Sequence, residues 1–490
     1  MASSSSHEHH IILFPFMAQG HLNPFMALAG LLARWTRLKI TFVNSPLNTR
    51  KLKAALPPDS AIHFADLPFN SSDHGLPPNC ENTQSVPPHL MFRFFQATET
   101  LQPAFEGFLS QVCEQDGRPP LCVISDEFMS WSVESARKFG VFHCVINTGG
   151  AYGSAVFYSV WKHLPHKETD SETIAVPEFP GVILHRTELS RSCQEADESD
   201  PWTILFRKHV KFISQADGMF VNTVEEIDDR GLDSLRKHVS RRIWAVGPLL
   251  RFSSSPSSSS TSIVEWLNKH SPNSVLYISF GSQNSMRPSQ MMELAKGLES
   301  SSKPFVWVLR PPIGFDVTEN FRTEWLPEGF EERVTGEKEQ GLLVKNWAPQ
   351  MEILAHESTG AFLSHCGWNS ILESLMAGVP IIGWPMDAEQ PFNLKYLVEE
   401  LKVGVEMARG PQAEIRADKI AETIKQFMDE EYGIGIEMRR KAKEFGELIT
   451  AATVNEENCK GPSVRALEDF LRTASSHAAK SHISSSENLY

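Results

Sequence analysis

Residues 363–370, with the sequence LSHCGWNS, end an apolar run with side chains that can bind an anion. Gly367 lets a ligand approach the backbone closely, and Asn369 and Ser370 add hydrogen-bond donors. His365 adds a further donor, or a positive charge if it is protonated. Together these residue types predict a site for a phosphate or diphosphate group.

A helix is expected directly after this cluster. Apolar residues recur at the spacing of one helix face, at Trp368, Ile371, Leu372, Leu375 and Met376. The first N–H groups of such a helix are unpaired and its positive dipole end faces the ligand. The alternative interpretation is that Trp368 serves only the core and that Cys366 is a small buried residue.

A second pair of residues has the chemistry of a general base. His21 follows the first predicted strand, and Asp126 ends a later strand, LCVISD. The carboxyl ends of parallel strands share one edge of a sheet, so the two side chains are expected to meet there. His21 would accept a proton while Asp126 orients the imidazole. The alternative is that Asp126 only caps the next helix and His21 only bonds to its loop.

The elements that must position these residues form two similar series of strands and helices. In the first half we expect strands at 10–16, 39–44 and 121–126 and a helix that begins at Pro24. In the second half we expect strands at 274–280, 304–310, 341–346, 360–365 and 378–385, with helices at 288–301 and 366–377. Alternating strands and helices indicate an α/β protein with two Rossmann-like domains.

The length of 490 residues also favours two domains. The serine-rich run at 252–262 is the longest low-complexity segment and is typical of a flexible linker. We therefore expect an N-terminal domain at 1–250, a linker at 251–262 and a C-terminal domain at 263–460. A further helix is expected at 461–475, and 476–490 are expected to form a tail whose last residues resemble part of a protease-site tag.

Composition excludes several classes of protein. The formal net charge of −14, without a Lys/Arg-rich run, argues against nucleic acid and anionic membranes as partners. No apolar run is long enough for a spanning helix, and the N-terminus does not resemble a signal peptide. The seven scattered cysteines indicate neither a disulfide framework nor a zinc site. A cytoplasmic protein is expected, and its oligomeric state cannot be predicted.

The chain resembles a known family over most of its length. Residues 347–390, from WAPQ to DAEQ, are similar to the signature box of plant family 1 UDP-sugar-dependent glycosyltransferases almost position for position. The similarity extends more loosely to SFGS at 279–282 and to the GHLNP segment. It implies a GT-B fold, in which two Rossmann-like domains face each other across a cleft and the helix at 461–475 packs back on the N-terminal domain.

The resemblance also implies a role for each matching residue. Trp347 would stack on uracil with Gln350 near the uridine, and Glu373 would accept both ribose hydroxyls. Four residues would hold the diphosphate: Ser282, His365, Asn369 and Ser370. Trp368, Glu389 and Gln390 would meet the sugar, and Gln at position 390 favours glucose. His21 and Asp126 match the catalytic pair of the family.

The expected reaction is glucose transfer from UDP-glucose to a hydroxyl of a small hydrophobic plant metabolite, with inversion. The acceptor is expected at segments 75–95 and 147–161, and flavonoids, other phenolics and terpenoids all remain open. No D-x-D motif is present, so neither a metal nor a cofactor beyond the UDP-sugar is expected.

Other functions remain as alternatives. The site would suit another UDP-sugar, a glycosylated acceptor, or a protein that binds UDP-sugar without catalysis. A nicotinamide oxidoreductase is less favoured because GGAYG at 149–153 lacks the G-x-G-x-x-G spacing. A serine hydrolase is disfavoured because the sequence has no G-x-S-x-G elbow.

Overall fold

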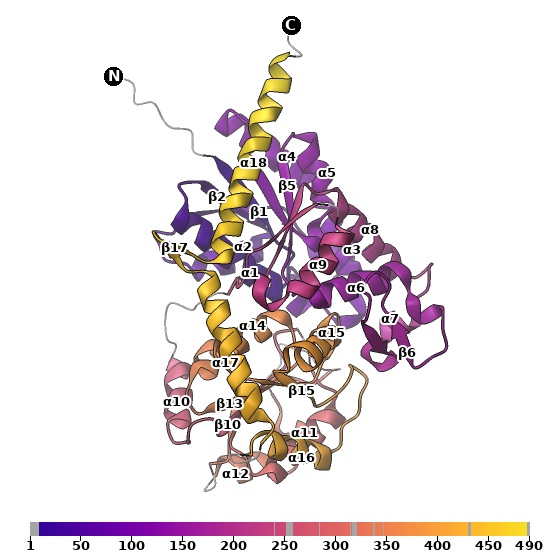
Figure 1. Cartoon of the computed structure of the whole chain (residues 1–490), viewed down its shortest axis with the longest axis vertical. Coiled ribbons are helices and arrows are strands. Elements are labelled where there is room, and N and C mark those ends of the chain that lie inside the picture. The colour runs from indigo at the N-terminus through magenta and orange to yellow at the C-terminus, as the bar shows by residue number, and fades with distance from the viewer. Residues whose placement is uncertain are drawn as a thin grey trace.

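The computed structural model contains two parallel β-sheets, one in each half of the chain, and both are covered by helices (Figure 1). The structure describes residues 9–239, 241–250, 258–283, 285–313, 315, 321–336, 339–345, 347–429 and 433–487. This organisation confirms the expected α/β class with two Rossmann-like domains.

The N-terminal sheet has seven strands in the order β3-β2-β1-β4-β5-β8-β9, and every neighbouring pair is parallel. Its strands are β1 His10–Phe14, β2 Lys39–Asn44, β3 Ile62–Asp66, β4 Cys122–Asp126, β5 Phe142–Asn147, β8 Gly218–Val221 and β9 Arg242–Ala245. The central strands are buried along their whole length, which explains their continuous apolar sequences.

Nine α-helices surround this sheet in the described part of the N-terminal half. They are α1 Gln19–Trp35, α2 Pro46–Ala54, α3 Met91–Glu99, α4 Gln102–Asp116, α5 Ser132–Lys138, α6 Ala151–His163, α7 Arg191–Glu195, α8 Pro201–Gln215 and α9 Asp229–His238. A short hairpin of β6 Thr173–Ala175 and β7 Ile183–His185 lies outside the sheet.

The C-terminal sheet has six parallel strands in the order β12-β11-β10-β13-β14-β15. Its strands are β10 Val275–Ser279, β11 Phe305–Leu309, β12 Gly341–Lys345, β13 Thr359–Ser364, β14 Ile381–Gly383 and β15 Gly404–Glu406. Its helices are α10 Ser258–Leu267, α11 Pro288–Ser301, α12 Phe330–Thr335, α13 Gln350–Ala355, α14 Trp368–Met376, α15 Gln390–Lys395 and α16 Ala417–Phe427.

Each sheet has one point where the strand order reverses direction. In the first sheet this point lies between β1 and β4, and in the second it lies between β10 and β13. Ligands of open α/β sheets bind beyond the carboxyl ends of the strands at such a point. One apolar cluster continues from the N-terminal domain into α14 and α15, so the two domains share buried surface.

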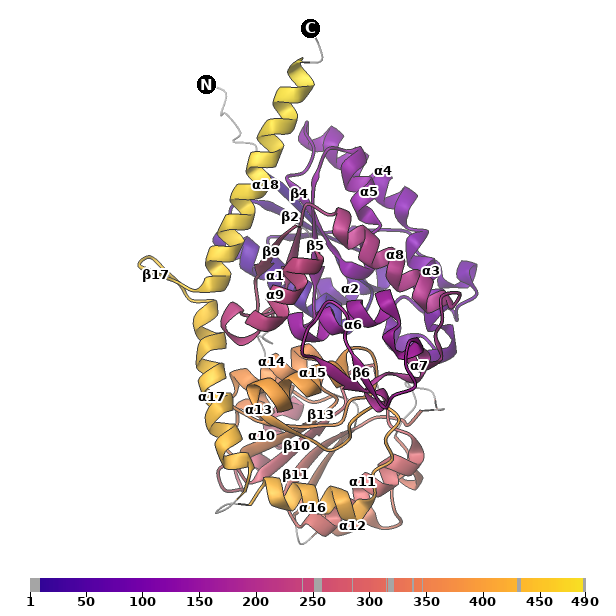
Figure 2. The ribbon, with the colours of Figure 1, turned by 45° about the vertical axis from the view of Figure 1, so that its right-hand side comes forward.

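The last two helices run along one side of the molecule, past both domains (Figure 2). They are α17 Gly435–Ala452 and α18 Pro462–Glu487, separated by a small hairpin of β16 Asn455–Glu456 and β17 Cys459–Lys460. On α18 the ring of Phe470 packs against Phe142 and Phe220 of the first sheet, and Trp244 Nε1 donates to Asp469 Oδ2 at 2.7 Å. The helix continues well past residue 475, where the sequence predicted its end.

Two further boundaries differ from the sequence-based expectation. Residues 258–262 of the expected linker belong to α10, and 251–257 lie outside the described residues. Helix α1 begins at Gln19, so the prediction that it begins at Pro24 is wrong. Pro24 lies inside the helix, where it removes one backbone donor. None of the helices within the described ranges is long and apolar enough to cross a membrane.

Candidate active site

His21 and Asp126 meet at the reversal point of the first sheet, although they are 105 positions apart in the chain. His21 lies in the first turn of α1, and Asp126 is the last residue of β4. Nδ1 of His21 lies 2.8 Å from Oδ2 of Asp126, which is fully buried. Asp126 Oδ1 also accepts from Phe128 N at 3.0 Å, so this aspartate both contacts His21 and caps the helical turn that follows β4.

The surroundings of His21 favour its protonated form. Burial by itself lowers the pKa of the imidazole, but the charge and the hydrogen bond of Asp126 outweigh burial, with further contributions from Glu127 and Glu389. The pKa of His21 is therefore raised above its ordinary value of 6.5. Because the carboxylate accepts the hydrogen of Nδ1, Nε2 is the nitrogen that can accept a proton from a ligand.

Aromatic rings form one wall beside His21. Phe16 lies 5.5 Å and Phe128 5.4 Å from the imidazole, measured between ring centroids. Phe95 packs edge-on against Phe128 at 5.1 Å, and Trp202 and Phe206 of α8 continue the cluster. Such a wall suits an apolar or ring-containing ligand.

At the reversal point of the second sheet, His365 is enclosed between two glycines. A Cβ on Gly281 would lie 2.7 Å from Nε2 of His365, and one on Gly367 would lie 2.5 Å from it. Burial lowers the pKa of His365 to about 4. Burial therefore favours the neutral form of His365 near pH 7, in which the imidazole is a hydrogen-bond donor and carries no positive charge. Ser282 follows Gly281 in the same turn and is half-buried.

The start of α14 carries Trp368, Asn369 and Ser370, and its first two side chains contact the N-terminal domain. Trp368 Nε1 donates to the carbonyl of Asn222 at 2.6 Å. Asn369 Nδ2 donates to the carbonyl of Gly20 at 2.8 Å, and its Oδ1 accepts from Asn222 Nδ2 at 3.1 Å. Asn369 keeps a second amide hydrogen for a ligand, whereas the single N–H of Trp368 is already used.

Gln350 and Glu373 form a polar cluster between α13 and α14. Gln350 Nε2 donates to the carboxylate of Glu373 and, at 3.0 Å, to Ser370 Oγ, while its Oε1 accepts from Tyr277 Oη at 3.2 Å. Burial raises the pKa of Glu373 to about 7, and the hydrogen bond from Gln350 opposes that shift. The carboxylate is thus a buried acceptor that hydroxyl groups of a ligand would stabilise.

The remaining residues of the signature box differ in exposure. Trp347 is 63% exposed just beyond β12, which is unusual for so large an apolar side chain. Gln390 is buried, and its Oε1 accepts from the N–H groups of Met386 and Asp387 at 2.9 and 3.1 Å. Because both bonds are accepted by Oε1, the amide group of Gln390 has one orientation, with Nε2 on the side away from Met386 N and Asp387 N. Glu389 accepts from Asn393 Nδ2 at 3.3 Å.

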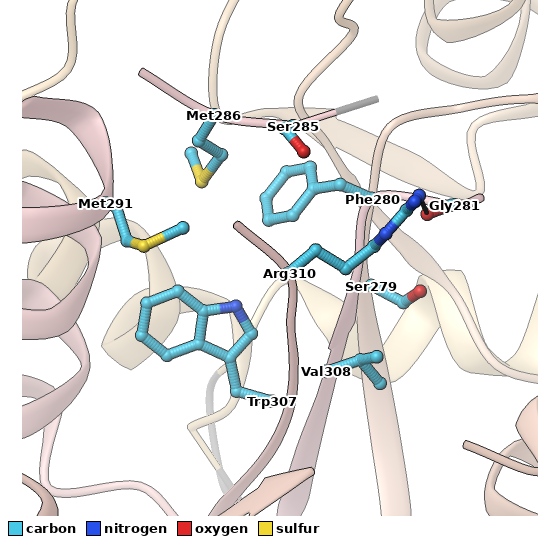
Figure 3. A pocket seen from close by; sticks show the side chains of 9 residues that line it. All are labelled: Ser279, Phe280, Gly281, Ser285, Met286, Met291, Trp307, Val308 and Arg310. Carbon is cyan, nitrogen blue, oxygen red and sulfur yellow. Dashed lines mark hydrogen bonds between the residues drawn. The ribbon is translucent and has the colours of Figure 1, made fainter. Parts of the chain in front are cut away.

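A small pocket lies at the carboxyl ends of β10 and β11, beside the turn that contains Gly281 (Figure 3). Its lining is mainly apolar and consists of Ser279, Phe280, Gly281, Ser285, Met286, Met291, Trp307, Val308 and Arg310. Arg310 Nη1 donates to the carbonyl of Gly281 at 3.1 Å and so supports the turn. In the part of the chain that the structure describes, no three His, Cys, Asp or Glu side chains group as metal ligands would.

Comparison with known proteins decides the family. The UDP-glucoronosyl and UDP-glucosyl transferase family matches residues 251–433, and the glycosyltransferase N-terminal domain family matches residues 8–251. UDP-glycosyltransferase 92A1 of Arabidopsis thaliana is 42% identical over 488 residues, which cover 97% of this chain and 99% of that protein. The chain belongs to the UDP-glycosyltransferase family. The resemblance stated from the signature box is thereby confirmed.

Other relatives of this UDP-glycosyltransferase come from plants too. Crocetin glucosyltransferase 3 of Crocus sativus is 42% identical over 441 residues, or 86% of this chain and 91% of that protein. The solved structure of UGT73P12 from Glycyrrhiza uralensis with glycyrrhetinic acid 3-O-monoglucuronide covers 98% of this chain and 99% of its own, with a TM-score of 0.84 and 26% identity. UGT71G1 of Medicago truncatula with UDP-glucose has a TM-score of 0.80 at 26% identity, over 96% of this chain and all of its own. The fold is GT-B.

Four residues at the site of the transferase were not singled out from the sequence, although one of them, Thr148, lies in the expected acceptor segment 147–161. Asn222, after β8, bonds to both Trp368 and Asn369. Thr148 Oγ1 lies 3.2 Å from His21 Nδ1. Glu127 is buried beside Asp126, and burial, with the charge of Asp126, raises its pKa to about 7. Arg310 supports the turn at Gly281. An isolated Asn, Thr, Glu or Arg at a strand end forms no recognisable motif, so only the fold identifies these four.

Proposed function

We propose that this UDP-glycosyltransferase transfers glucose from UDP-glucose to a hydroxyl group of a small, largely apolar plant metabolite, with inversion at the anomeric carbon. The observation that carries the proposal is the bond of His21 Nδ1 to buried Asp126, which leaves Nε2 as the nitrogen that can accept a proton, in an imidazole that lies beside the rings of Phe16 and Phe128. A base beside an apolar surface is what deprotonation of a small hydroxylated ring compound requires.

UDP-glucose would bind along the start of α14. Trp347 would stack on uracil, since its exposed indole offers a free face. Glu373 would accept the ribose hydroxyls, with Gln350 beside it. The N–H groups at the start of α14, together with Ser282, neutral His365, Asn369 and Ser370, would hold the diphosphate.

The sugar would lie between the two domains. Gln390 would donate to it through Nε2, because its Oε1 is occupied by backbone N–H groups. Glu389 would accept from its hydroxyls. Trp368 would contribute only the apolar surface of its ring, since its N–H is bonded to Asn222. Glutamine at position 390 supports glucose as the donor sugar.

In the proposed reaction, Nε2 of His21 takes the proton of the acceptor hydroxyl as the acceptor oxygen attacks the anomeric carbon. The bond from that carbon to the diphosphate oxygen breaks on the opposite face, and UDP leaves. Asp126 stabilises the imidazolium, and the helix start and the His365 donor stabilise the leaving diphosphate. The step uses no metal ion and no cofactor beyond the UDP-sugar.

The acceptor would be a flavonoid, another phenolic or a terpenoid. The aromatic wall supports this choice, and relatives named for crocetin and scopoletin as acceptors support it further. A second candidate is transfer from another UDP-sugar or to an acceptor that already carries a sugar. The structural relative with glycyrrhetinic acid 3-O-monoglucuronide favours keeping that candidate.

The test is incubation of the parent protein and His21→Ala with UDP-glucose, UDP-galactose or UDP-glucuronic acid and a panel of phenolics and terpenoids, followed by mass spectrometry. We expect a hexose adduct from UDP-glucose that β-glucosidase removes and that His21→Ala does not form. Equal product from parent and variant would refute His21 as the base. A preference for another donor, or a product resistant to β-glucosidase, would refute the glucose or the inversion assignment.

A further inference from the structure

Pro24 leaves the carbonyl of Gly20 without its usual partner inside α1. In an α-helix the N–H of residue 24 would donate to the carbonyl of residue 20, and proline has no N–H. The Gly20 carbonyl accepts instead from Asn369 Nδ2, 2.8 Å away on α14 of the other domain. The residue that precedes His21 is therefore bonded directly to the start of the helix proposed to hold the diphosphate.

Asn222 fixes the orientation of this Asn369 amide. Its Nδ2 donates to Asn369 Oδ1 at 3.1 Å, and its carbonyl accepts from Trp368 Nε1 at 2.6 Å. The Asn222 side chain is fully buried, and its own Oδ1 accepts from Leu249 N at 2.7 Å. The bonds to Asn369 and from Leu249 agree on one orientation of the Asn222 side-chain amide, because exchanging its oxygen and nitrogen would lose both, while the Trp368 bond holds the Asn222 backbone.

The same Asn222 amide also reaches the segment on the other side of His21. Its Nδ2 lies 3.4 Å from the carbonyl of Thr148, to which it donates. The hydroxyl of Thr148 lies 3.2 Å from His21 Nδ1. One buried side chain thus connects the start of α14 with two neighbours of the proposed base, Gly20 through Asn369 and Thr148 directly.

We propose that Asn222 is a positioning residue for sugar transfer. It holds Asn369 against the Gly20 carbonyl and thereby sets the distance between the bound UDP-sugar and Nε2 of His21. The proposal rests on the function proposed above, with His21 as the base. Transfer depends steeply on this distance, because a displacement of about 1 Å can cost roughly 10²-fold in rate.

The decisive variant is Asn222→Asp. Aspartate keeps the size of the side chain and an acceptor for Leu249 N, but it removes both N–H donors, to Asn369 and to Thr148. We expect kcat for glucose transfer to the best acceptor of the panel to fall about 10- to 100-fold. The KM for UDP-glucose and the Kd of UDP should change much less than kcat, since Ser282, His365, Ser370 and the N–H groups at the start of α14 still hold the diphosphate.

Tyr396→Phe is the matched control. Tyr396 Oη donates to the carbonyl of Ile227 at 2.6 Å, which is another buried hydrogen bond between the same two domains but one that leads to neither neighbour of His21. We expect nearly parental kcat for this variant. Equal losses in Asn222→Asp and Tyr396→Phe would overturn the proposal, because the effect would then be general docking of the domains.

Pro24→Ala is the second variant. Alanine has a higher helix propensity than proline, so the substitution itself favours the helical conformation of α1. Its new N–H would compete with Asn369 for the Gly20 carbonyl, so we expect a smaller loss of kcat without a lower Tm. This variant decides the question if Asn222→Asp does not fold. A parental kcat in Asn222→Asp would overturn the proposal, and so would a parental kcat in Pro24→Ala if only that variant folds. A fall in kcat/KM that comes wholly from a higher KM for UDP-glucose would overturn it too. His21→Ala tests the proposed function separately.

Discussion

Nε2 of His365 occupies the space that a side chain at Gly281 would fill. A Cβ on Gly281 would lie 2.7 Å from this nitrogen, and the backbone φ of Gly281, +76°, is in the left-handed region. The turn after β10 thus packs against the loop after β13 at Gly281 and His365, where the imidazole lies against the glycine backbone. The proposed diphosphate site therefore requires both the absence of a side chain at Gly281 and the donor of His365.

Gly281→Ala should consequently weaken donor binding. The added methyl group would displace His365, so we expect the Kd of UDP and the KM of UDP-glucose to rise about tenfold, the equivalent of one good hydrogen bond. Gly117→Ala is the matched control, because Gly117 has a similar φ of +68° but nothing within 4 Å of its Cβ position. Equal effects of the two variants on donor binding would show that backbone strain, not His365, is responsible. Titration calorimetry with UDP measures the difference.

The pH dependence of transfer should report the pairing of His21 with Asp126. As the proposed base, His21 must be neutral to accept a proton, and its pKa is raised above 6.5, so kcat/KM should rise with pH through a midpoint above 6.5. Asp126→Asn removes the charge that raises the pKa, so the midpoint should move to lower pH. The plateau should also fall, by roughly 10²- to 10⁴-fold. An unchanged midpoint in the variant would mean that the acid limb belongs to another group.

The sequence predicted the strands and the signature box well, for a physical reason. Central strands such as β4 and β13 are buried on both faces, so their sequences are short, mainly apolar runs. Such runs differ from the spaced apolar residues of an amphipathic helix. The box lies on one continuous segment, in which the spacing of Gln350, Ser370 and Glu373 is set by two neighbouring helices. Local sequence therefore contained most of what places them.

The missed features depend on contacts between distant segments. Proline is usual at the start of a helix, but Pro24 lies inside α1. The carbonyl of Gly20, which proline leaves without an intrahelical donor, accepts a hydrogen bond from Asn369 of the other domain instead. The charge of His365 depends on burial under the Gly281 turn. Asn222 acquires its bonds only when β8 and α14 meet. None of these relationships has a fixed spacing along the chain.

UDP-glucose binding should release protons near neutral pH. The pKa of Glu373 is raised to about 7 in the free protein because the carboxyl group is buried. Ribose hydroxyls that donate to the carboxylate would favour its ionised form and lower that pKa. Binding should therefore weaken as pH falls below about 7, and at pH 7 it should release part of a proton.

Calorimetry in buffers of different ionisation enthalpy measures this proton release directly. UDP-glucose is a suitable ligand because its diphosphate diester does not titrate near neutral pH. Glu373→Gln should abolish the release and raise the donor KM, while the acceptor KM stays close to the parent value. Release that persists in Glu373→Gln would assign the proton to a different group and remove the support for the ribose role.

The opposite edge of the first sheet offers a test of stability that is independent of catalysis. At the amino end of β1, His10 is buried, with Nδ1 2.6 Å from Asp116 Oδ2 and Nε2 2.8 Å from Thr41 Oγ1. Lys39 Nζ also donates to Asp116 Oδ1 at 2.9 Å. Asp116→Ala would leave a buried imidazole N–H unpaired, which costs about 1–3 kcal/mol of unfolding free energy.

Urea unfolding should therefore show a lower midpoint for Asp116→Ala, whereas kcat at 25 °C should remain parental because β1 separates this cluster from His21. Glu195→Ala is the matched control: it removes an exposed carboxylate paired with Arg191 one helical turn away, and exposed pairs of this kind contribute little. If the two variants unfold at the same urea concentration, the His10 cluster does not stabilise the domain. If Asp116→Ala loses activity while still folded, the two edges of the sheet are coupled, contrary to the separation that the strand imposes.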